Sequence, residues 1–417
     1  MPAPHRASRT TRNSVHDLRG ATRLALEAIR GVTDLVEAMH HEIAGGPRVL
    51  GRPLEAPVRL FSRPVYGGIR RVTRLVGAGI DGALAGLAPL VGESGSGPKR
   101  EALLAALNGV LGDYLAGSGN PLAIEMGLRH RGQPLELERR ALRLALPRAS
   151  GKVLVLVHGS CLNDRHWARS GHDHGAALAH HLGFTPAHLR YNSGLHISTN
   201  GRAFAALLER LVAAWPTPIE ELVIVAHSMG GLVSRSACHY GEVAGHAWRR
   251  KLRALVCLGS PHHGAPLERG GHWVDLLLGI SRYSAPLARL GRIRSAGVTD
   301  MRFGSVLDEH WEGRDRFAHA RDGRTPLQPP AGVECYAIAA TRAPRGGGTR
   351  LGDGLVPVDS ALGRHARPEL TLGFPRAHQW IAHGMGHFDL LGRAEVYAKI
   401  RSWLSSRKGN PRRSRRA

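Results

Sequence analysis

The stretch LVIVAHSMGGLVSRSA, residues 222–237, constrains the fold more than any other part of the sequence. Its first half is an uncharged, β-branched run typical of a strand buried on both faces, and its second half has a helical pattern. The change falls at Ser228, which must stand on a sharp turn between strand and helix. This turn strains the serine backbone. The residues two before and two after it must be small so that the strand and the helix can approach each other, as Ala226 and Gly230 are.

Other runs of the same kind surround this motif. We expect strands at VLVLVHG (153–159), LRALVCLG (252–259) and VECYAIAA (333–340), with helical patterns between them. Residues 122–146 also predict strands, broken by a turn at Gly132 to Pro134. Strands that alternate with helices predict an α/β protein with a mostly parallel central sheet flanked by helices.

The N-terminal part has a different organisation. Apolar residues three or four apart, after a capping-box-like spacing from Ser14 to Asp17, predict an amphipathic helix that ends near Gly45. The apolar stretch 69–92 is too interrupted to span a membrane, and residues 92–100 form a Gly/Ser-rich linker before another helix at 103–111. We therefore predict an N-terminal helical region at 1–98, a catalytic domain at 99–406 and a basic disordered tail at 407–417.

The charge balance is strongly basic. With 57 Lys and Arg against 33 Asp and Glu, the formal net charge is +24 in a chain of 417 residues. Arg supplies nearly all of this excess, and we favour coding bias as its origin. The functional alternative is peripheral contact with an anionic membrane, whereas specific nucleic-acid binding is disfavoured because no known motif for it is present.

Cysteines and the N-terminal residues bear on the compartment. The four cysteines are widely spaced in apolar contexts, which indicates buried thiols rather than a metal site or a disulfide framework. The first twenty residues lack the apolar run of a secretory signal. We expect a cytoplasmic protein, with peripheral membrane contact as the minority interpretation.

A serine at such a turn needs a base, because its hydroxyl is a weak nucleophile until an imidazole takes the proton. The candidate is His387, which lies in a glycine-rich loop before the final amphipathic helix, so that its ring can reach the carboxyl edge of the sheet. His383 and His378 lie nearby and remain competitors.

The third member of such a group is a carboxylate that fixes the histidine tautomer and stabilises the imidazolium. Asp353, in the loop GDGLVPVDS after the strand at 333–340, has the expected position between serine and histidine in chain order. Asp359 in the same loop is the alternative, and either residue could instead be an ordinary turn aspartate.

A negatively charged oxygen that develops during attack requires backbone N–H donors. Met229, at the start of the helix after Ser228, supplies one. Ser160, in the loop after the strand at 153–159, is the preferred second donor, and Cys161 is the alternative. We interpret His158 as a structural residue that holds this loop.

Residues 133–405 contain four motifs in this order: HGSC, AHSMGG, GDGLVP and GHFDLL. With these motifs the region resembles the bacterial serine lipase and esterase branch of the α/β-hydrolase superfamily, including GPI inositol-deacylase-like relatives. The resemblance implies a catalytic triad of Ser228, Asp353 and His387 and an oxyanion hole of Ser160 and Met229. It also implies an acyl-enzyme mechanism without metal or organic cofactor. Ala226 departs from the family pattern, which has glycine there.

The segment after SPHHGAPLERGG, residues 260–271, resembles the insertions that cap active sites in this family. We predict a lid-like helical insertion at about 265–330, with core packing as the alternative for any one of its residues. His262 and His263 lack a carboxylate partner in the sequence and are not assigned to a metal.

Three functions remain open at this point. The favoured one is hydrolysis of lipid or other acyl esters. The same three residues would also serve an acyltransferase or thioesterase, and a non-catalytic membrane-associated binding protein is the third alternative. The sequence leaves the acyl chain, the alcohol and the oligomeric state undetermined.

Overall fold

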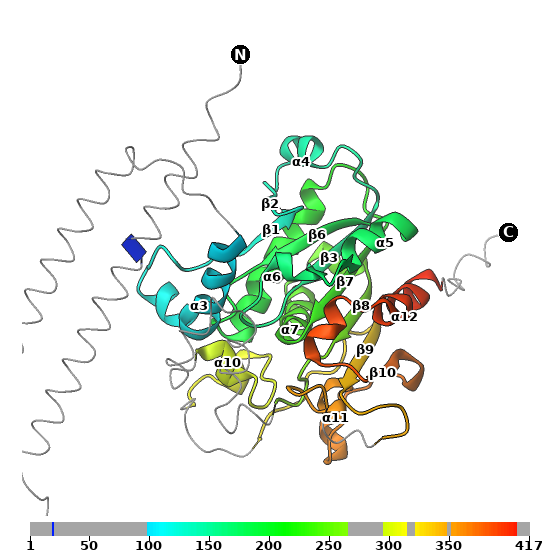
Figure 1. Ribbon diagram of the computed structural model, residues 1–417. Coiled ribbons are helices and arrows are strands. Elements are labelled where there is room, and N and C mark those ends of the chain that lie inside the picture. Colours follow the sequence, from blue (N-terminus) through cyan, green and yellow to red (C-terminus); the bar gives the residue numbers. More distant parts are fainter. Residues whose placement is uncertain (1–18, 21–97, 266–294, 315–321, 348–351, 407–417) are drawn as a thin grey trace, which may run out of the picture. The chain divides into compact units, whose positions relative to one another are not determined.

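The structure is a computed structural model that describes residues 19–20, 98–265, 295–314, 322–347 and 352–406 (Figure 1). By its contacts the chain divides into two compact units, residues 1–100 with 115–123 and residues 101–114 with 124–417. The sheet and the candidate site lie in the second unit. Of the predicted N-terminal region 1–98, only Arg19, Gly20 and Pro98 are described, and all three are helical.

The second unit is built on an eight-stranded sheet with the order β10-β9-β8-β7-β3-β6-β1-β2. Every neighbouring pair from β10 to β6 is parallel, and β1 and β2 add an antiparallel hairpin at the edge. The strands are β1 Gly127–His130, β2 Gln133–Pro134, β3 Lys152–Val157, β6 Thr185–Arg190, β7 Glu221–His227, β8 Leu252–Leu258, β9 Glu334–Thr341 and β10 Gln379–His383. This arrangement confirms the predicted α/β class with a mostly parallel sheet.

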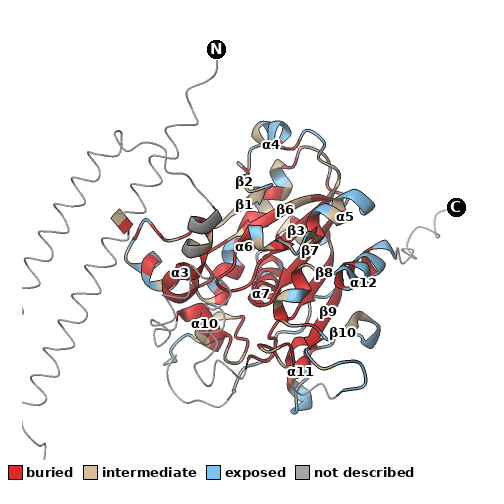
Figure 2. Cartoon of the chain, in the orientation of Figure 1, coloured by how far each residue is buried: buried red, intermediate tan, exposed pale blue. Residues whose placement is uncertain are grey.

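Helices cover both faces of this sheet. The larger helices among the described residues are α3 Pro98–Gly117, which runs through parts of both units, and α5 His174–Leu182, α6 Ile197–Ala214, α7 Met229–Val243 and α12 Ala394–Ser405 of the second unit. Short elements lie between strands, namely α4 Arg139–Ala145, η2 Asp164–Trp167, the β4 Ala168–Arg169 and β5 His172–Asp173 hairpin, η3 Ala247–Arg250, α10 Ala296–Asp300, η5 Asp308–His310, α11 Val358–Ala361, η6 Pro368–Leu370, η7 Arg376–His378 and η8 His387–Leu391. Buried residues run along the strands and α7 (Figure 2).

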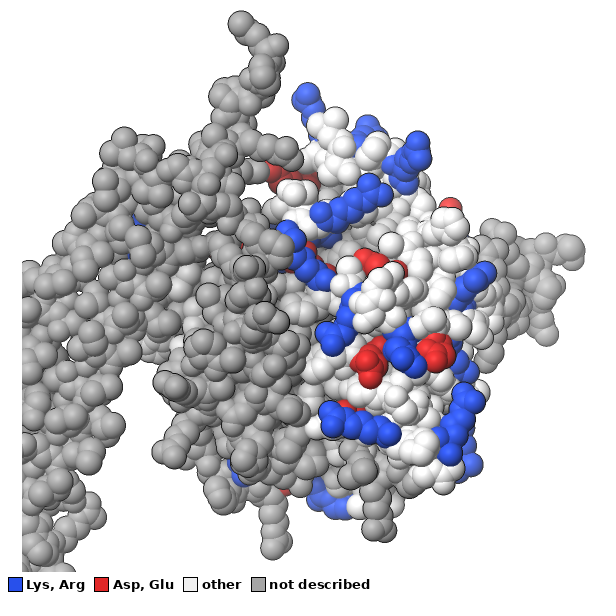
Figure 3. All heavy atoms as spheres, in the orientation of Figure 1, with Lys and Arg blue, Asp and Glu red and all other residues white. Residues whose placement is uncertain are grey.

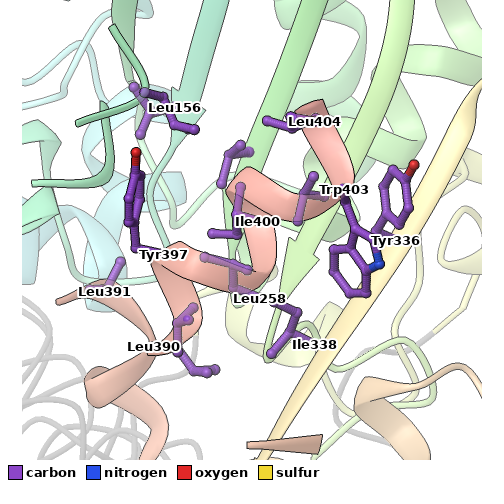
Figure 4. Close-up of a cluster of buried hydrophobic side chains, with 14 of the residues drawn as sticks. Leu156, Leu258, Tyr336, Ile338, Leu390, Leu391, Tyr397, Ile400, Trp403 and Leu404 are labelled. Carbon is purple, nitrogen blue, oxygen red and sulfur yellow. The ribbon is translucent and has the colours of Figure 1, made fainter. Parts of the chain in front are cut away.

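The core on one face of the sheet lies between its central strands and α12. Leu156, Leu258 and Ile338 project from β3, β8 and β9, and Ile400 and Trp403 of α12 pack against this face (Figure 4). Each of the five is less than a tenth exposed. Because side chains alternate along a strand, the intervening residues face the opposite side, where α7 packs against β7 and β8.

The predicted strands at 153–159, 252–259 and 333–340 correspond to β3, β8 and β9, and β7 ends at the predicted residue before Ser228. One prediction is wrong. Residues 139–145, interpreted as part of a strand, form α4, in which Leu142 is buried while Leu144 is 78% exposed. The alternating leucines resembled a strand, but Arg, Ala and Leu are good helix formers and one buried leucine anchors the helix.

The hairpin turn also differs from the prediction by about one residue. Arg131 and Gly132 form the two-residue loop between β1 and β2, with φ angles of 50° and 76°, and Gln133 already pairs with His130. Two successive residues with positive φ are what a tight two-residue hairpin requires.

Candidate active site

Ser228 lies directly after β7 and is the N-cap of α7. Its φ of 54° and ψ of −126° place a non-glycine residue in a strained region of backbone space, as the sequence predicted. Its N–H donates a hydrogen bond of 2.8 Å to the carbonyl of Leu258, the last residue of β8. The neighbouring strand therefore holds the strained turn in place.

Glycines around Ser228 allow three backbone segments to come together. A Cβ at Gly230 would lie 2.6 Å from the carbonyl oxygens of Val157 and His158, so α7 starts directly against the end of β3. A Cβ at Gly159 would lie 2.9 Å from Cβ of Ser228. Both distances are too short for any larger residue, because a real Cβ atom essentially never lies within 3.0 Å of such an atom.

Asp353 and His387 form a buried pair. The Nδ1 of His387 donates to Oδ2 of Asp353 at 2.7 Å, and the side chains are 1% and 0% exposed. The other carboxylate oxygen accepts the backbone N–H groups of Leu355 and Val356 at 2.9 and 2.7 Å. Because Nδ1 carries the proton, the neutral ring keeps its lone pair on Nε2, which is the protonation state that a general base needs.

The competing residues lie elsewhere. Asp359 is exposed in the first turn of α11, where its carboxylate is 3.9 Å from Arg364. The Nδ1 of His378 donates to the carbonyl of Cys335, and His383 ends β10 without a hydrogen bond from its buried Nδ1 to any described residue. Among these candidates, Asp353 and His387 are the residues that meet.

His227 connects the serine to this pair. It directly precedes Ser228, its Nε2 donates to the carbonyl of His387 at 3.1 Å, and the two ring centroids are 4.6 Å apart. Burial and the neighbouring His387 lower the pKa of His227 well below its usual value, so the ring is a neutral donor. His227 therefore connects the start of η8 at His387 to the end of β7, directly before Ser228.

The predicted oxyanion donors lie on the two sides of this turn. Met229 is the first residue of α7, where a helix leaves N–H groups without intrahelical partners. Among the described residues, neither the N–H of Ser160 nor that of Met229 donates a hydrogen bond. The N–H of Cys161, the alternative donor, is instead bonded to Oγ of Ser193 at 3.1 Å.

His158 holds the loop that carries Ser160. Its ring stacks on Tyr191 with centroids 4.4 Å apart, and the hydroxyl of Tyr191 donates to the carbonyl of His158 at 2.9 Å. Burial lowers the pKa of His158 to about 4, so the residue is neutral at ordinary pH. This geometry fits the structural role expected from the sequence.

Sequence analysis overlooked His227 and Ser193. The position of His227 was a usable signal, since it directly precedes the serine at the carboxyl end of a buried strand. No local pattern marks Ser193, because its contact with Cys161 joins residues 32 positions apart.

The predicted insertion at about 265–330 is described in part. Residues 295–314 contain α10 and η5, whereas 266–294 and 315–321 lie outside the described residues. His262 and His263 are buried beside Arg235 of α7, which donates to Nδ1 of His262 at 3.2 Å. Across the described ranges, no group of three or more His, Cys, Asp or Glu side chains is arranged to hold a metal ion.

Comparison with known families adds to this geometry. Residues 196–325, which include Ser228 and α7, match the family model described as a PGAP1-like alpha/beta domain. This match covers less than half of the chain and includes the strained serine after β7.

Solved structures similar to this chain include three lipases. The mature lipase BlEst2 of Bacillus licheniformis is 17% identical over 61% of this chain and 92% of its own, with a TM-score of 0.41. Lipase B of Aspergillus fumigatus is 13% identical over 63% and 54%, and lipase 1 of Pelosinus fermentans is 13% identical over 62% and 100%, each with a TM-score of 0.38. No curated protein sequence matches the chain.

Proposed function

We propose that this chain is an α/β-hydrolase, and that it is a serine hydrolase that cleaves carboxylic esters. Ser228 is the nucleophile, His387 the general base and Asp353 the residue that orients His387. The observation that carries the proposal is the buried 2.7 Å hydrogen bond between His387 and Asp353. His387 is itself bonded through its carbonyl to His227, the residue directly before a serine whose φ is 54°. A pair with this geometry fixes the tautomer and the orientation of the imidazole that must remove the serine proton.

The chemistry follows in two halves. The Oγ of Ser228 attacks the ester carbonyl while Nε2 of His387 takes the proton of the serine hydroxyl. The resulting oxyanion accepts hydrogen bonds from the N–H groups of Ser160 and Met229. Collapse breaks the bond to the alcohol, which leaves with the proton from His387. A water molecule then attacks the acyl-enzyme with His387 again as base, so that the acid is released and Ser228 is restored.

The positive end of α7 supports the oxyanion role of Met229. A helix concentrates about half an elementary positive charge at its N-terminus, and α7 starts at Met229 without a side-chain cap. A transition-state oxygen at this position meets both that partial charge and a donor that needs no reorganisation.

The decisive experiment compares wild type with Ser228→Ala, and with Ser405→Ala as a control at an exposed serine of α12. Each protein is incubated with a fluorophosphonate probe and with p-nitrophenyl esters of graded acyl length. We expect labelling and turnover in wild type and the control, and neither in Ser228→Ala, because the covalent intermediate requires that oxygen. The preferred ester then gives the acyl length.

Two other outcomes are informative. Labelling without turnover by folded wild type would indicate an acyl acceptor other than water, as in an acyltransferase. Absence of both signals in folded wild type would overturn the assignment of Ser228.

Peripheral contact with an anionic membrane is a separate proposal. It is supported by the net charge of +24 and by the Lys and Arg side chains that spread over the face drawn in Figure 3. No helix of the described residues is long and apolar enough to cross a bilayer. Co-sedimentation with phosphatidylglycerol vesicles that is lost in phosphatidylcholine vesicles would support this contact, because charge attraction requires anionic lipid.

A further inference from the structure

The short helix η8, His387–Leu391, is held from outside by two buried imidazoles. The Nε2 of His227 lies 3.1 Å from the carbonyl oxygen of His387, and the Nε2 of His174 lies 2.9 Å from the carbonyl oxygen of Leu390. A carbonyl can only accept a hydrogen bond, so Nε2 must carry the proton in both rings. The first and fourth residues of η8 are thereby fixed to β7 and to α5.

The tautomer of His174 is fixed by a further histidine. With its proton on Nε2, the neutral ring of His174 accepts at Nδ1, where the Nε2 of His172 lies 2.9 Å away. His172 therefore donates to His174, and His174 donates to Leu390. Asp173 between them caps α5 by accepting the N–H of Ala176 at 2.9 Å, which fixes the backbone of this segment.

A shift of η8 at Leu390 would also displace the ring of His387. The position that a Cβ of Gly259 would take lies 2.9 Å from Cδ1 of Leu390 and 3.2 Å from Cε1 and Nδ1 of His387. Both side chains therefore rest against the same backbone after β8. A helix of five residues has few hydrogen bonds of its own, so outside contacts decide where it lies.

We infer that His174 is a positioning residue for the base of the reaction, and that His172 fixes the tautomer in which His174 does so. The inference rests on the proposed function, because it assigns His174 an effect on His387. His174 is fully buried and reaches η8 across 216 residues of sequence. Misplacement of a reacting group by about 1 Å can cost roughly 100-fold in rate.

A purely structural role makes a different prediction. His174 also packs near Trp167 and Tyr397, with centroids 6.4 and 6.2 Å away. If packing were its whole contribution, substitution would lower the free energy of unfolding and leave the kcat of the folded enzyme unchanged. The experiment must therefore measure kcat per folded active site.

The test uses two substitutions of His174 in the full chain. His174→Phe keeps an aromatic ring and removes the donor, whereas the amide N–H of His174→Gln takes approximately the position of Nε2. We expect His174→Phe to lower kcat by roughly 10- to 100-fold with KM changed less than about twofold, and His174→Gln to recover most of the loss. Fluorophosphonate titration of Ser228 counts the active sites.

Control variants separate the contact with η8 from a general effect of substituting a histidine in this region. His181→Phe lies on the same helix α5, but its hydrogen bonds go to Ala177 and Tyr397 rather than to η8, so wild-type kcat is expected. His172→Leu removes the donor to His174 at a half-buried site, and we expect a smaller, severalfold loss of kcat. This variant keeps the inference testable if His174→Phe does not fold.

Proton NMR gives a readout besides rate. The proton between His387 and Asp353 should resonate far downfield in wild type and broaden in His174→Phe, because a mobile η8 lengthens that hydrogen bond. Wild-type kcat, pH profile and downfield signal in His174→Phe and His172→Leu would overturn the inference while leaving the proposed function intact. Unlabelled, inactive wild type would instead remove the proposed function on which the inference rests.

Discussion

At the scale of single residues, the site depends on how closely backbone segments approach Ser228. The strained conformation at Ser228 costs about 1–3 kcal/mol and persists only where its surroundings enforce it. The hydrogen bond to Leu258 and the close approach of Gly159 and Gly230 supply that enforcement. Each of these glycines is needed for space, since both have unremarkable φ angles.

Gly159→Ala tests this close approach. The new methyl group would lie 2.9 Å from Cβ of Ser228, so the loop carrying Ser160 must move away from the serine. We expect a loss of about 1–3 kcal/mol in the free energy of unfolding, with a larger proportional loss of kcat. Gly127→Ala is the matched control, because its Cβ would meet no atom within 4 Å. Equal kcat in both variants would contradict the packing argument.

Asp353 and Asp359 can be distinguished by the same substitution. Asp353→Asn disturbs the hydrogen bond that sets the His387 tautomer, and we expect kcat to fall by roughly 10³- to 10⁴-fold. Asp359→Asn alters an exposed carboxylate and should leave kcat within about twofold of wild type, since surface ion pairs contribute little. Steady-state kinetics on purified proteins checks both, and the reverse order of effects would reassign the acid.

At the scale of elements, α10 in the described part of the predicted insertion is hydrogen-bonded to the start of α6. Asp300, the last residue of α10, accepts the N–H of Ile197 at 2.8 Å and lies 3.1 Å from Nδ1 of His196. His196 in turn stacks on Trp311, with centroids 3.7 Å apart. A carboxylate at this helix N-terminus satisfies an N–H group that the helix cannot pair and interacts favourably with the helix dipole.

Asp300→Ala should therefore lower the free energy of unfolding. It leaves the buried N–H of Ile197 without this acceptor, and we expect a loss of about 1–3 kcal/mol in the free energy of unfolding. Asp300→Asn retains an acceptor and should lose less. Glu309→Gln, at a largely exposed side chain of η5, serves as the neutral control. Urea unfolding of the three variants measures the differences. An unchanged free energy of unfolding in Asp300→Ala would show that the contact between Asp300 and the start of α6 does not stabilise the fold.

At the scale of the whole molecule, buried neutral histidines couple stability to pH. Burial lowers the pKa of His158 and of His174 to about 4, and burial lowers that of His227 and His262 well below the usual value. In the unfolded chain these rings take up protons near pH 6.5. Between pH 6.5 and pH 4 the unfolded state therefore binds more protons than the folded state.

The sign of the effect follows from this difference. Because the unfolded state binds more protons, the free energy of unfolding rises with pH across this window and falls as the solution is acidified. His158 and His174 both contribute to this loss, because burial lowers the pKa of each to about 4. Urea midpoints measured from pH 7.5 to pH 4.5 should fall steadily below pH 6.5. A midpoint independent of pH would show that these rings are not neutral and buried.

Local patterns explain how much of this could be predicted. The strand before Ser228, the helix after it and the strands β3, β8 and β9 are set by residues a few positions apart, through alternation and β-branching. The strained turn at Ser228 follows from the same short stretch. The pattern failed at α4, where alternating leucines occur in good helix formers and the burial of Leu142 alone decides the outcome.

The sequence by itself determined the α/β class, the position of the turn at Ser228 and a short set of candidate partners for it. Only the tertiary structure decided which candidates meet: Asp353 rather than Asp359 contacts His387, and Ser193 engages Cys161 rather than Ser160. It also brought His174 to η8 across 216 residues. Periodicity reflects neighbours along the chain, whereas a hydrogen bond between distant residues depends on how strands and loops are brought together, which no local pattern encodes.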